Sequence, residues 1–470
     1  MSSLNASLAT ALSGLTAEQA ALATTTNNVA NVNTPGYTRE VPILETSDPV
    51  VEDSLTLGTG VTVQSIESIR DPILESQIQQ ETQTQGQLNA LVSALSQTQT
   101  SFTSTTGDIG SAISNFFDSI NQLSTSPTDL SLRQGVLTAA NNLATAFNTA
   151  ANNLTAQRTS LDGSVEQTVG QINQLTQQIA QLNTQIANLE NAGESAGTFI
   201  DQRTEAIDQL SNLVDVSVIP SGNTVTLTTA SGTALVAGQQ SFALTTQPDS
   251  SGLQHVYSGT HDITATIVSG QLGGLLQARD QQIPAIQTQL DTLAAGIANA
   301  VNNVQTNGYD LNGNPTGATD ANGNPQTPVY MFTPPPASGQ GAAASMSVAI
   351  TDPSLIAASS DGTVGSNGNA EAMYALSNQA VISGQTPSNY YSGIVFNVGN
   401  AAANASAEQT ASSQVLQQLN DQRAAISGVS LDQEAANMVE YQQAYDASAQ
   451  VVTAINDMMY ATIQMTTLTD

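Results

Sequence analysis

Apolar residues recur every seven positions near both ends of the chain. This spacing predicts a helix with one narrow apolar stripe, as in a coiled coil. The other positions of both segments are mostly Ala, Ser, Thr, Asn and Gln, so neither helix has enough apolar surface to be stable alone. Two outcomes fit the periodicity: neighbouring copies cover the helices, or both pack on the chain's own middle part. The stripes, with two residues that extend the second, are Leu8, Leu15, Leu22, Val29, Leu431, Met438, Tyr441, Tyr445, Val452, Ile455 and Met459.

The first helix ends in a turn. Thr34 precedes Pro35, which disfavours the helical conformation at Thr34. Pro35 and Gly36 suit the two central positions of a type II turn, because Gly tolerates the positive φ that the second position needs. Strand-like alternation follows at 41–43 and 61–69.

The region from about Pro72 to Leu213 shows helical periodicity, with separate apolar stripes at 74–95, 113–123 and 132–161. A coiled-coil seam then alternates spacings of three and four. Gln and Asn flank this seam instead of Glu and Lys, so charge does not select its partner. We interpret it as part of an internal helix hairpin and not as a separate dimer zipper. The seam residues are Ile172, Leu175, Ile179, Leu182, Ile186 and Leu189.

Period-two alternation replaces the helical pattern between about Asp215 and Gly270, for example at 225–228 and 263–267. Helix resumes from about Gly273 to Val304. Turn-rich sequence follows, with short β segments expected near 345–350, and helix returns at about Ala403 with a break at Gly428.

These patterns predict a multidomain, mainly α protein with a nested organisation. Discontinuous, coiled-coil-like terminal helices (1–40 plus 430–470) bracket a helical bundle domain with short β segments (41–213 plus 271–429). That domain in turn brackets an inserted small β-rich domain (214–270).

The charge balance excludes several classes of function. The chain has 38 acidic residues, seven Arg and no Lys, for a formal net charge of -31. Nucleic-acid binding needs clustered cationic side chains, and the same requirement weakens binding to anionic membranes. The first residues lack the features of a cleaved signal peptide, and no apolar run is long enough for a membrane span. We therefore expect no nucleic-acid partner and no membrane insertion.

Enzymatic or metal-binding sites are not indicated. The two histidines, His255 and His261, could join Asp262 at a metal, but a third ligand is not evident, and surface or strand positions are the better interpretation. Asp310 begins a motif similar to a calcium loop, yet the closing position holds Ala321, so turn chemistry explains it better. The chain has no Cys. We expect no cofactor, no metal and no catalysis.

Long motifs at both ends resemble the flagellar rod, hook and hook-associated protein family. The first motif runs from Asn27 through Asn31, Val32 and Asn33 to Thr34-Pro35-Gly36-Tyr37-Thr38-Arg39. Its Thr-Arg ending resembles the hook-associated members more than the hook protein. The stretch 429–449 is similar to the C-terminal end of the family, and 272–280, 308–313 and 350–359 resemble its interior. The β-rich insert carries no such match.

The resemblance implies a structural subunit that assembles at the distal end of the hook and forms the junction on which the filament is built. It implies contacts with further copies, the hook protein and a second junction protein. It also implies an export chaperone and the flagellar type III apparatus, which exports such proteins to the extracellular flagellum without a cleaved signal. The assembly turn carried over from the family consists of Asn31, Asn33, Thr34, Pro35, Gly36, Tyr37 and Arg39.

Two alternatives stay open at this point. A hook or distal-rod subunit would share the N-terminal motif, although the segment 441–445 argues against it. An adhesin or binding module that uses flagellar ends for export would place its function in the insert. Because the chain has no Lys, we expect contacts between copies to depend on apolar and amide groups.

Overall fold

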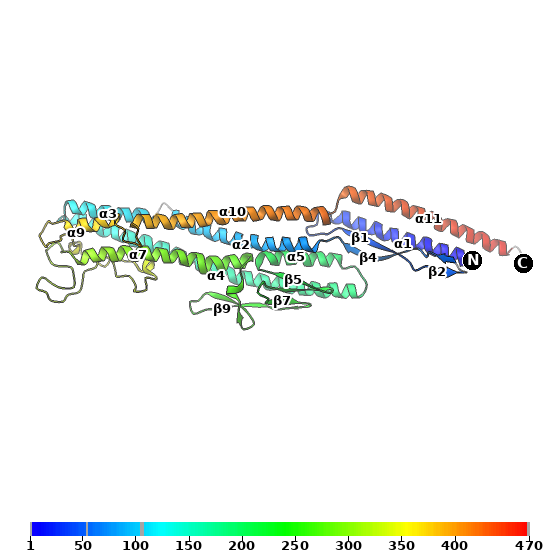
Figure 1. Cartoon of the computed structure of the whole chain (residues 1–470), viewed down its shortest axis with the longest axis horizontal. Helices are drawn as coiled ribbons and strands as arrows, with labels where there is room; N and C mark the ends of the chain where they lie inside the picture. The colour runs from blue at the N-terminus through cyan, green and yellow to red at the C-terminus, as the bar shows by residue number, and fades with distance from the viewer. Residues whose placement is uncertain (1, 53–54, 104–107, 468–470) are drawn as a thin grey trace.

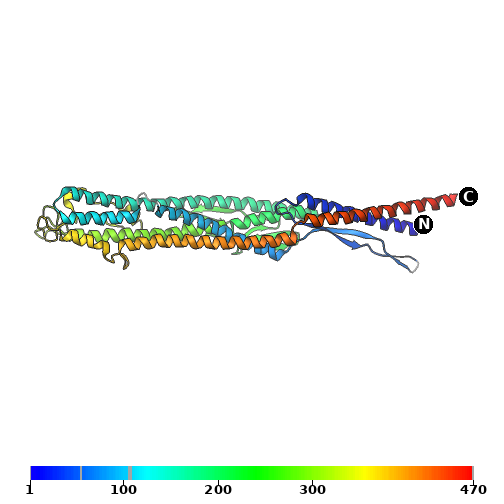
Figure 2. The same ribbon diagram turned by 90° about the horizontal axis from the view of Figure 1, so that it is seen from above.

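The computed structural model describes residues 2–52, 55–103 and 108–467, and it shows a long rod (Figure 1). Both termini lie at the same end of this rod. The helices of the bundle run side by side along most of its length, and a narrower unit made from both chain ends continues beyond them (Figure 2). The predicted mainly α, multidomain fold class is confirmed.

The terminal unit consists of two helices and a β-hairpin. Helices α1 (Ser2–Asn31) and α11 (Leu431–Thr467) pack against each other in antiparallel directions. Strands β1 (Glu40–Thr46) and β4 (Val61–Ser68) pair antiparallel, and both contact α1. The short strands β2 (Val50–Glu52) and β3 (Leu55–Leu57) extend this hairpin. We therefore propose that the terminal unit includes the chain up to about residue 70 and does not stop at 40.

The bundle is built from helices that alternate in direction around one apolar core. The longest, α4, has 62 residues, so the stripe predicted at 132–161 and the seam belong to one continuous helix. The Asp129 side chain accepts hydrogen bonds from the first-turn amides of Ser131 and Leu132, which stabilises the start of α4. The bundle helices are α2 (Pro72–Thr103), α3 (Ile109–Thr125), α4 (Leu130–Asn191), α5 (Gly197–Leu213), α6 (Gly270–Gln277), α7 (Ile283–Thr306), α8 (Ala342–Ser345), α9 (Gly368–Ala375) and α10 (Pro387–Ser427). A π-helical segment (Ala278–Gln282) joins α6 to α7.

Two expectations for the second half of the chain are wrong. Helix α10 begins at Pro387, sixteen residues before the predicted start, because Thr386 caps it and Tyr391, Ile394 and Val398 already form a buried stripe. The segment near 345–350 contains no strand in the described structure. It holds only the bridge between Phe332 and Val348, and its first residues belong to α8.

The insert forms two small antiparallel sheets on the side of α4 (Figure 1). One has the order β5-β6-β7-β8 and the other the order β11-β10-β9. The strand expected at 263–267 is wrong: Asp262 Oδ1 accepts the amide and hydroxyl protons of Thr264 and starts a 3-10 turn, η1 (Thr264–Thr266). The strands are β5 (Ser217–Ser221), β6 (Thr224–Thr228), β7 (Ala234–Ala237), β8 (Gln240–Ser241), β9 (Leu244–Pro248), β10 (Gln254–Ser258) and β11 (His261–Asp262).

Polar side chains of α4 anchor the insert. Asn183 is fully buried, and its carboxamide binds the backbone N–H and C=O of Val225 and the C=O of Gly238. Asn173 binds the N–H and C=O of Leu244 in the same way, at 2.8 Å each. These contacts satisfy backbone N–H and C=O groups of both sheets. One hydrophobic cluster accordingly includes residues of the bundle and of the insert.

The coiled-coil seam is buried inside the chain. Ile172, Ile179 and Ile186 are fully buried, and α4 contacts α5 and the strands of the insert along this part of its length. The seam is thus intramolecular, as predicted, but the insert covers it together with the second helix of the hairpin.

Candidate assembly site

The turn after α1 has the predicted conformation. The Tyr37 amide donates to the Thr34 carbonyl at 3.2 Å, and Gly36 has φ +76°, which confirms a type II turn. The Asn31 side chain donates to the Asn27 carbonyl, and the Thr34 hydroxyl donates to Asn31 Oδ1. The remaining motif positions, Asn33 and Pro35, are exposed.

A buried asparagine fixes the hairpin to α1. Asn28 Nδ2 donates to the Glu40 carbonyl at 2.8 Å, and Asn28 Oδ1 accepts the Glu40 amide at 3.0 Å. The Tyr37 hydroxyl also donates to Asn28 Oδ1. Burial raises the pKa of the Glu40 carboxyl above its ordinary value. After the turn, the chain runs back along α1, and the Asn28 side chain holds it there.

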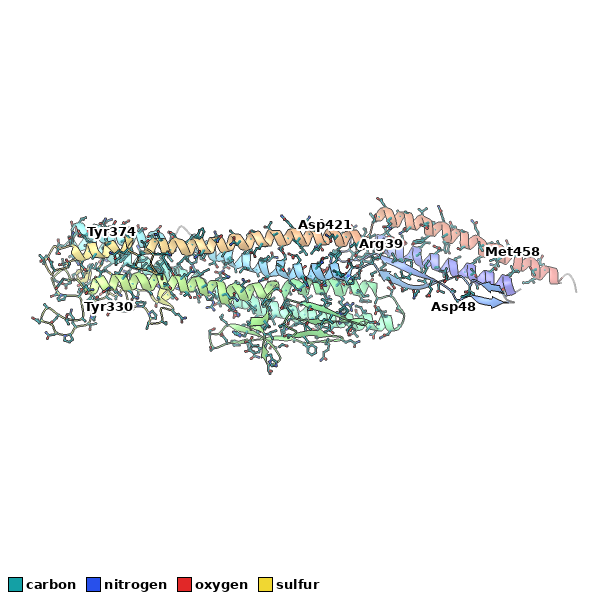
Figure 3. All side chains as sticks on the ribbon, viewed as in Figure 1. Arg39, Asp48, Tyr330, Tyr374, Asp421 and Met458 are labelled. Carbon is teal, nitrogen blue, oxygen red and sulfur yellow. The ribbon has the colours of Figure 1, made fainter. Side chains whose placement is uncertain are left out.

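Arg39 connects three segments where α10 ends and α11 begins (Figure 3). Its Nε donates to Glu434 Oε1 at 2.8 Å, and its amide donates to the Ser427 carbonyl at 2.9 Å. Glu434 is nearly fully buried. Gly428 lies between the two helices, where a Cβ atom would come within 2.2 Å of the Ala424 carbonyl oxygen. The break that was predicted at Gly428 is thus held by an ion pair and by close backbone packing.

Three further ion pairs lie where the terminal unit meets the bundle. Arg70 binds Asp201 and Glu75, and Asp201 Oδ2 accepts the Thr38 amide at 3.1 Å. Arg423 of α10 binds Asp208 of α5 at 3.2 Å. Burial raises the pKa of Asp208 to about 6, although the Arg423 guanidinium opposes this shift. We call Arg39, Arg70, Arg423 and their carboxylate partners the elbow network.

All seven arginines donate to groups on their own chain. Outside the elbow network, Arg133 binds backbone carbonyls that include Ile356 O, Arg158 binds the Arg279 carbonyl, and Arg203 binds Asn183. Arg279 binds Asp162 and Asp280. Since the chain has no Lys, every Lys or Arg side chain is already engaged within the monomer.

The heptad stripe residues of α1 and α11 differ in exposure. Ile455 is buried, with 5% of its surface exposed, whereas Leu431 is 52% exposed. The other predicted contact residues are half-buried in the single chain: Leu8, Leu15, Leu22, Val29, Met438, Tyr441, Tyr445, Val452 and Met459.

The best-buried positions of α1 escaped the sequence analysis. They are small or polar residues on one side of the leucine stripe, namely Ala17, Ala21, Thr24, Thr25 and Asn28. Their spacing of three and four residues indicates one face of a helix, and this pattern could have identified them. Glu434, Asp201 and Asp208 were also missed, because their partners lie far away in sequence.

Large apolar residues remain exposed on both sides of the inner stripe of α11. At 100° per residue, Leu431, Val439 and Tyr460 lie on one flank of the helix, and Val451 and Met458 lie on the other. Each is at least 50% exposed. Met458 is near the free end of α11 (Figure 3). We call these two surfaces the first and second flanks of α11.

The candidate metal ligands do not converge. His255 Nδ1 contacts Asp262 Oδ2 at 2.6 Å, and His255 Nε2 lies 3.6 Å from Asp249. Across the described residues, no group of three or more His, Cys, Asp or Glu side chains is arranged to hold a metal ion. Asp310 accepts the amides of Asn312 and Asn314, which is turn chemistry. No helix in the described part of the chain is long and apolar enough to cross a membrane.

The fold and the paired ends define a protein of the flagellar rod and hook class. Residues 8–38 match the family model described as flagella basal body rod protein. Residues 411–465 match the model described as flagellar basal body rod FlgEFG protein C-terminal. These two segments include most of α1 and α11, which are the two helices of the terminal unit.

The chain belongs to the family of flagellar hook-associated protein 1. Residues 95–319 match the model described as flagellar hook-associated protein FlgK helical domain. The chain is 30% identical to flagellar hook-associated protein 1 of Bacillus subtilis, over 98% of both chains. It is 29% identical to the Escherichia coli protein of that name, over 97% of this chain and 98% of the relative.

A solved structure supports the fold. The flagellar hook junction protein FlgK from Burkholderia pseudomallei aligns with a TM-score of 0.64 at 20% identity. The alignment covers 75% of this chain and 100% of that one.

Proposed function

We propose that this chain is a structural subunit of the bacterial flagellum that assembles at the distal end of the hook and forms the junction on which the filament is built. Family membership supports the junction role. The contacts between copies are carried by the terminal unit, and the observation that points there is the pair of exposed apolar flanks on α11.

The two flanks explain why the terminal unit would need neighbours. The inner stripe of α11 is used by α1 of the same copy, so each flank is available to a different neighbour. Contacts between unlike surfaces generate rings or helical arrays instead of closed dimers. The same argument assigns the half-buried stripe residues to contacts within a copy, and Leu431 to contacts between copies.

The charges of the terminal helices define the chemistry of these contacts. Helix α1 carries one acidic residue, α11 carries five, and neither contains Lys or Arg. Copies therefore repel one another electrostatically, and apolar and amide contacts must hold them together. Association between copies strengthens with salt, because salt screens the repulsion.

We propose the following partners and location, which family membership supports. The partners are further copies, the hook protein, a second junction protein, and an export chaperone with the type III apparatus. The product is extracellular, exported without a cleaved signal. Matches of both chain ends to rod-protein models support assembly with hook components, and membership of a structural family supports a non-enzymatic role.

A hook or distal-rod subunit is the weaker alternative, because the match over 95–319 is to the hook-associated helical domain. An adhesin housed in the insert is also weaker. The insert shares its hydrophobic core with the bundle, so it is a poor candidate for a separable module.

Electron microscopy of cells that lack the gene tests the proposal. We expect hooks without filaments, together with flagellin monomer in the medium. Basal bodies without hooks would move the subunit to the hook or rod, and normal filaments would contradict the junction role.

A further inference from the structure

The β1–β4 hairpin of the terminal unit has two outer edges that differ in their backbone groups. In an antiparallel pair, alternate residues direct both N–H and C=O toward the partner strand or away from it. Glu40 is opposite Ser68, Val41 is opposite Glu67, and Pro42 is opposite Ile66. These pairings fix which backbone groups point outward on each strand.

The outer edge of β1 is closed. The N–H and C=O of Glu40 point away from β4, because the Asn28 carboxamide binds both. Two residues further along, Pro42 has the same orientation and no N–H to offer. Proline on an edge strand is a common obstacle to pairing with another strand. A further strand therefore cannot add to this side.

The outer edge of β4 has the opposite character. Opposite Glu40 and Pro42, Ser68 and Ile66 direct their N–H and C=O groups away from β1. Ile69, which directly follows Ser68, has the opposite orientation: its amide donates to the Arg39 carbonyl at 2.9 Å. This alternation agrees with an outward orientation of Ser68. Ser195 Oγ donates to the Ile66 carbonyl at 3.4 Å, which confirms that this carbonyl points outward.

A groove runs along this edge. It has a volume of about 620 Å³, and the residues of β4 line one side. The turn between α4 and α5, residues 193–197, lines the other. Ser68 Oγ and Arg70 Nε, which belong to residues that line the groove, are buried and have no hydrogen-bond partner among the described residues. Buried polar atoms usually have a hydrogen-bond partner in the protein or in ordered water.

The groove is also acidic. Glu67, Glu190 and Glu194 line it, and its single cationic residue, Arg70, is paired with Asp201 and Glu75. A segment that carries Lys or Arg would complement these carboxylates. A second copy of this chain is a poor source of such a side chain, because all seven of its arginines already donate within the monomer and it has no Lys.

We propose that the β4 edge binds an extended segment, bearing at least one Lys or Arg, from a protein other than this chain. The segment adds to the hairpin as a third strand, with main-chain hydrogen bonds at Ile66 and Ser68. Its basic side chains face Glu67, Glu190 and Glu194. This interaction is separate from the contacts of the α11 flanks and does not depend on the junction role.

Fluorescence anisotropy of the full chain with three fluorescein-labelled peptides tests this binding. The probes are acetyl-Thr-Arg-Val-Thr-Val-Arg-Thr-amide, the same peptide with Glu in place of Arg, and an N-methylated backbone version of the first. We expect the first peptide to bind about tenfold more tightly than either of the others. Equal affinities for all three, or no binding of the first at millimolar concentration, would overturn the proposal.

Substitutions locate the site. Ile66→Pro removes an outward donor without removing a bond to β1, and it should weaken binding of the first peptide about tenfold. Glu190→Gln with Glu194→Gln should weaken it by a similar factor while leaving β4 intact. Pro42→Val, on the closed outer edge of β1, is the matched control. This variant should bind the first peptide with the same affinity as the wild type. Unchanged affinity in both groove variants would contradict the assignment.

Amide exchange on the wild-type chain gives a readout that needs no substitution. The Ile66 and Ser68 amides should exchange about tenfold more slowly with the first peptide present, and the Glu67 amide should change little. Fast exchange at Ile66 in saturating peptide would overturn the proposal. So would sedimentation that shows self-association abolished by Ile66→Pro, because the occupant would then be a second copy.

Discussion

The seam of α4 and the stripes of the terminal helices share the same kind of apolar repeat, but they end in different environments. Ile172, Ile179 and Ile186 of the seam are fully buried by α5 and the insert. In the terminal unit, Leu15 and Val452 are only half-buried. A repeat therefore identifies the face of a helix that will be covered, but it does not show whether the cover comes from the same chain.

The difference also predicts where the chain can interact. All six seam residues are buried or half-buried, Leu175 and Leu189 being the half-buried ones, and the insert contributes to this cover. The terminal helices keep exposed apolar residues such as Val439 and Val451 on both flanks of the inner stripe. Incomplete cover in one region of an otherwise well-packed chain is what an assembly surface requires.

The largest effect on the isolated chain is expected in the seam. Ile179→Ala leaves a cavity between α4 and its cover, and it should lower the free energy of unfolding by about 3 kcal/mol. Urea denaturation followed by circular dichroism measures this. Gln178→Ala, at an exposed position of the same helix, is the control and should change stability by less than about 0.5 kcal/mol. Equal losses of stability in Ile179→Ala and Gln178→Ala would contradict the burial of the seam that distinguishes it from the terminal helices.

The elbow network should show an effect of similar size that stays within the terminal unit. Arg39→Ala leaves the buried carboxylate of Glu434 without its cation and should cost roughly 3 kcal/mol within the terminal unit alone. Amides in the first turns of α11 should then exchange about a hundredfold faster, while amides of α4 keep their rates. Adding Glu434→Gln should restore part of the protection. Faster exchange throughout the bundle would contradict a separate terminal unit.

A pH-dependent prediction concerns the insert. Burial raises the pKa of Asp215 to about 6. Among the residues that the structure describes, only the Ala230 amide donates a hydrogen bond to this carboxylate from another residue. Between about pH 4 and pH 6 the folded chain therefore holds a proton that the unfolded chain has lost, so stability falls as the pH rises through this window. We expect the free energy of unfolding of Asp215→Asn, relative to that of the wild type, to rise by about 2 kcal/mol between pH 4 and pH 7. Urea denaturation measures this difference. A pH-independent difference would contradict the shift.

Periodicity was sufficient for the elements whose apolar residues are regularly spaced. It located α1, the seam of α4 and α11, and the proline-glycine pair located the turn after α1. It failed at 263–267, where Asp262 starts a 3-10 turn through its own side chain. It also failed at the first part of α10, where a capped helix with a buried stripe contains Gly393 and Gly399. Turn chemistry and capping override a short alternating pattern.

The candidate site was only partly predictable for a related reason. The turn motif is continuous in sequence, so a family resemblance could identify it. Glu434 and Asp201 contribute only because the fold brings them to Arg39 and to Thr38 and Arg70, across more than a hundred residues each. The sequence alone does not show which apolar residues of α11 are covered by α1 and which stay exposed on its flanks. That distinction requires the packing of α11 on α1.

The smallest effect on the isolated chain is expected on the second flank of α11. Val451→Asp changes a half-exposed residue, so the stability of the monomer should shift by less than about 0.5 kcal/mol in urea denaturation. Ile455→Asp, four residues further along and buried against α1, should instead disrupt the terminal helix pair. This contrast separates contacts between copies from contacts within one copy.

Electron microscopy of cells that carry Val451→Asp in place of the wild-type gene tests the central claim most directly. The account predicts hooks without filaments, although the purified variant unfolds like the wild type. Filaments of normal length and number on these cells would contradict the assignment of the α11 flanks as the contact surface of the junction.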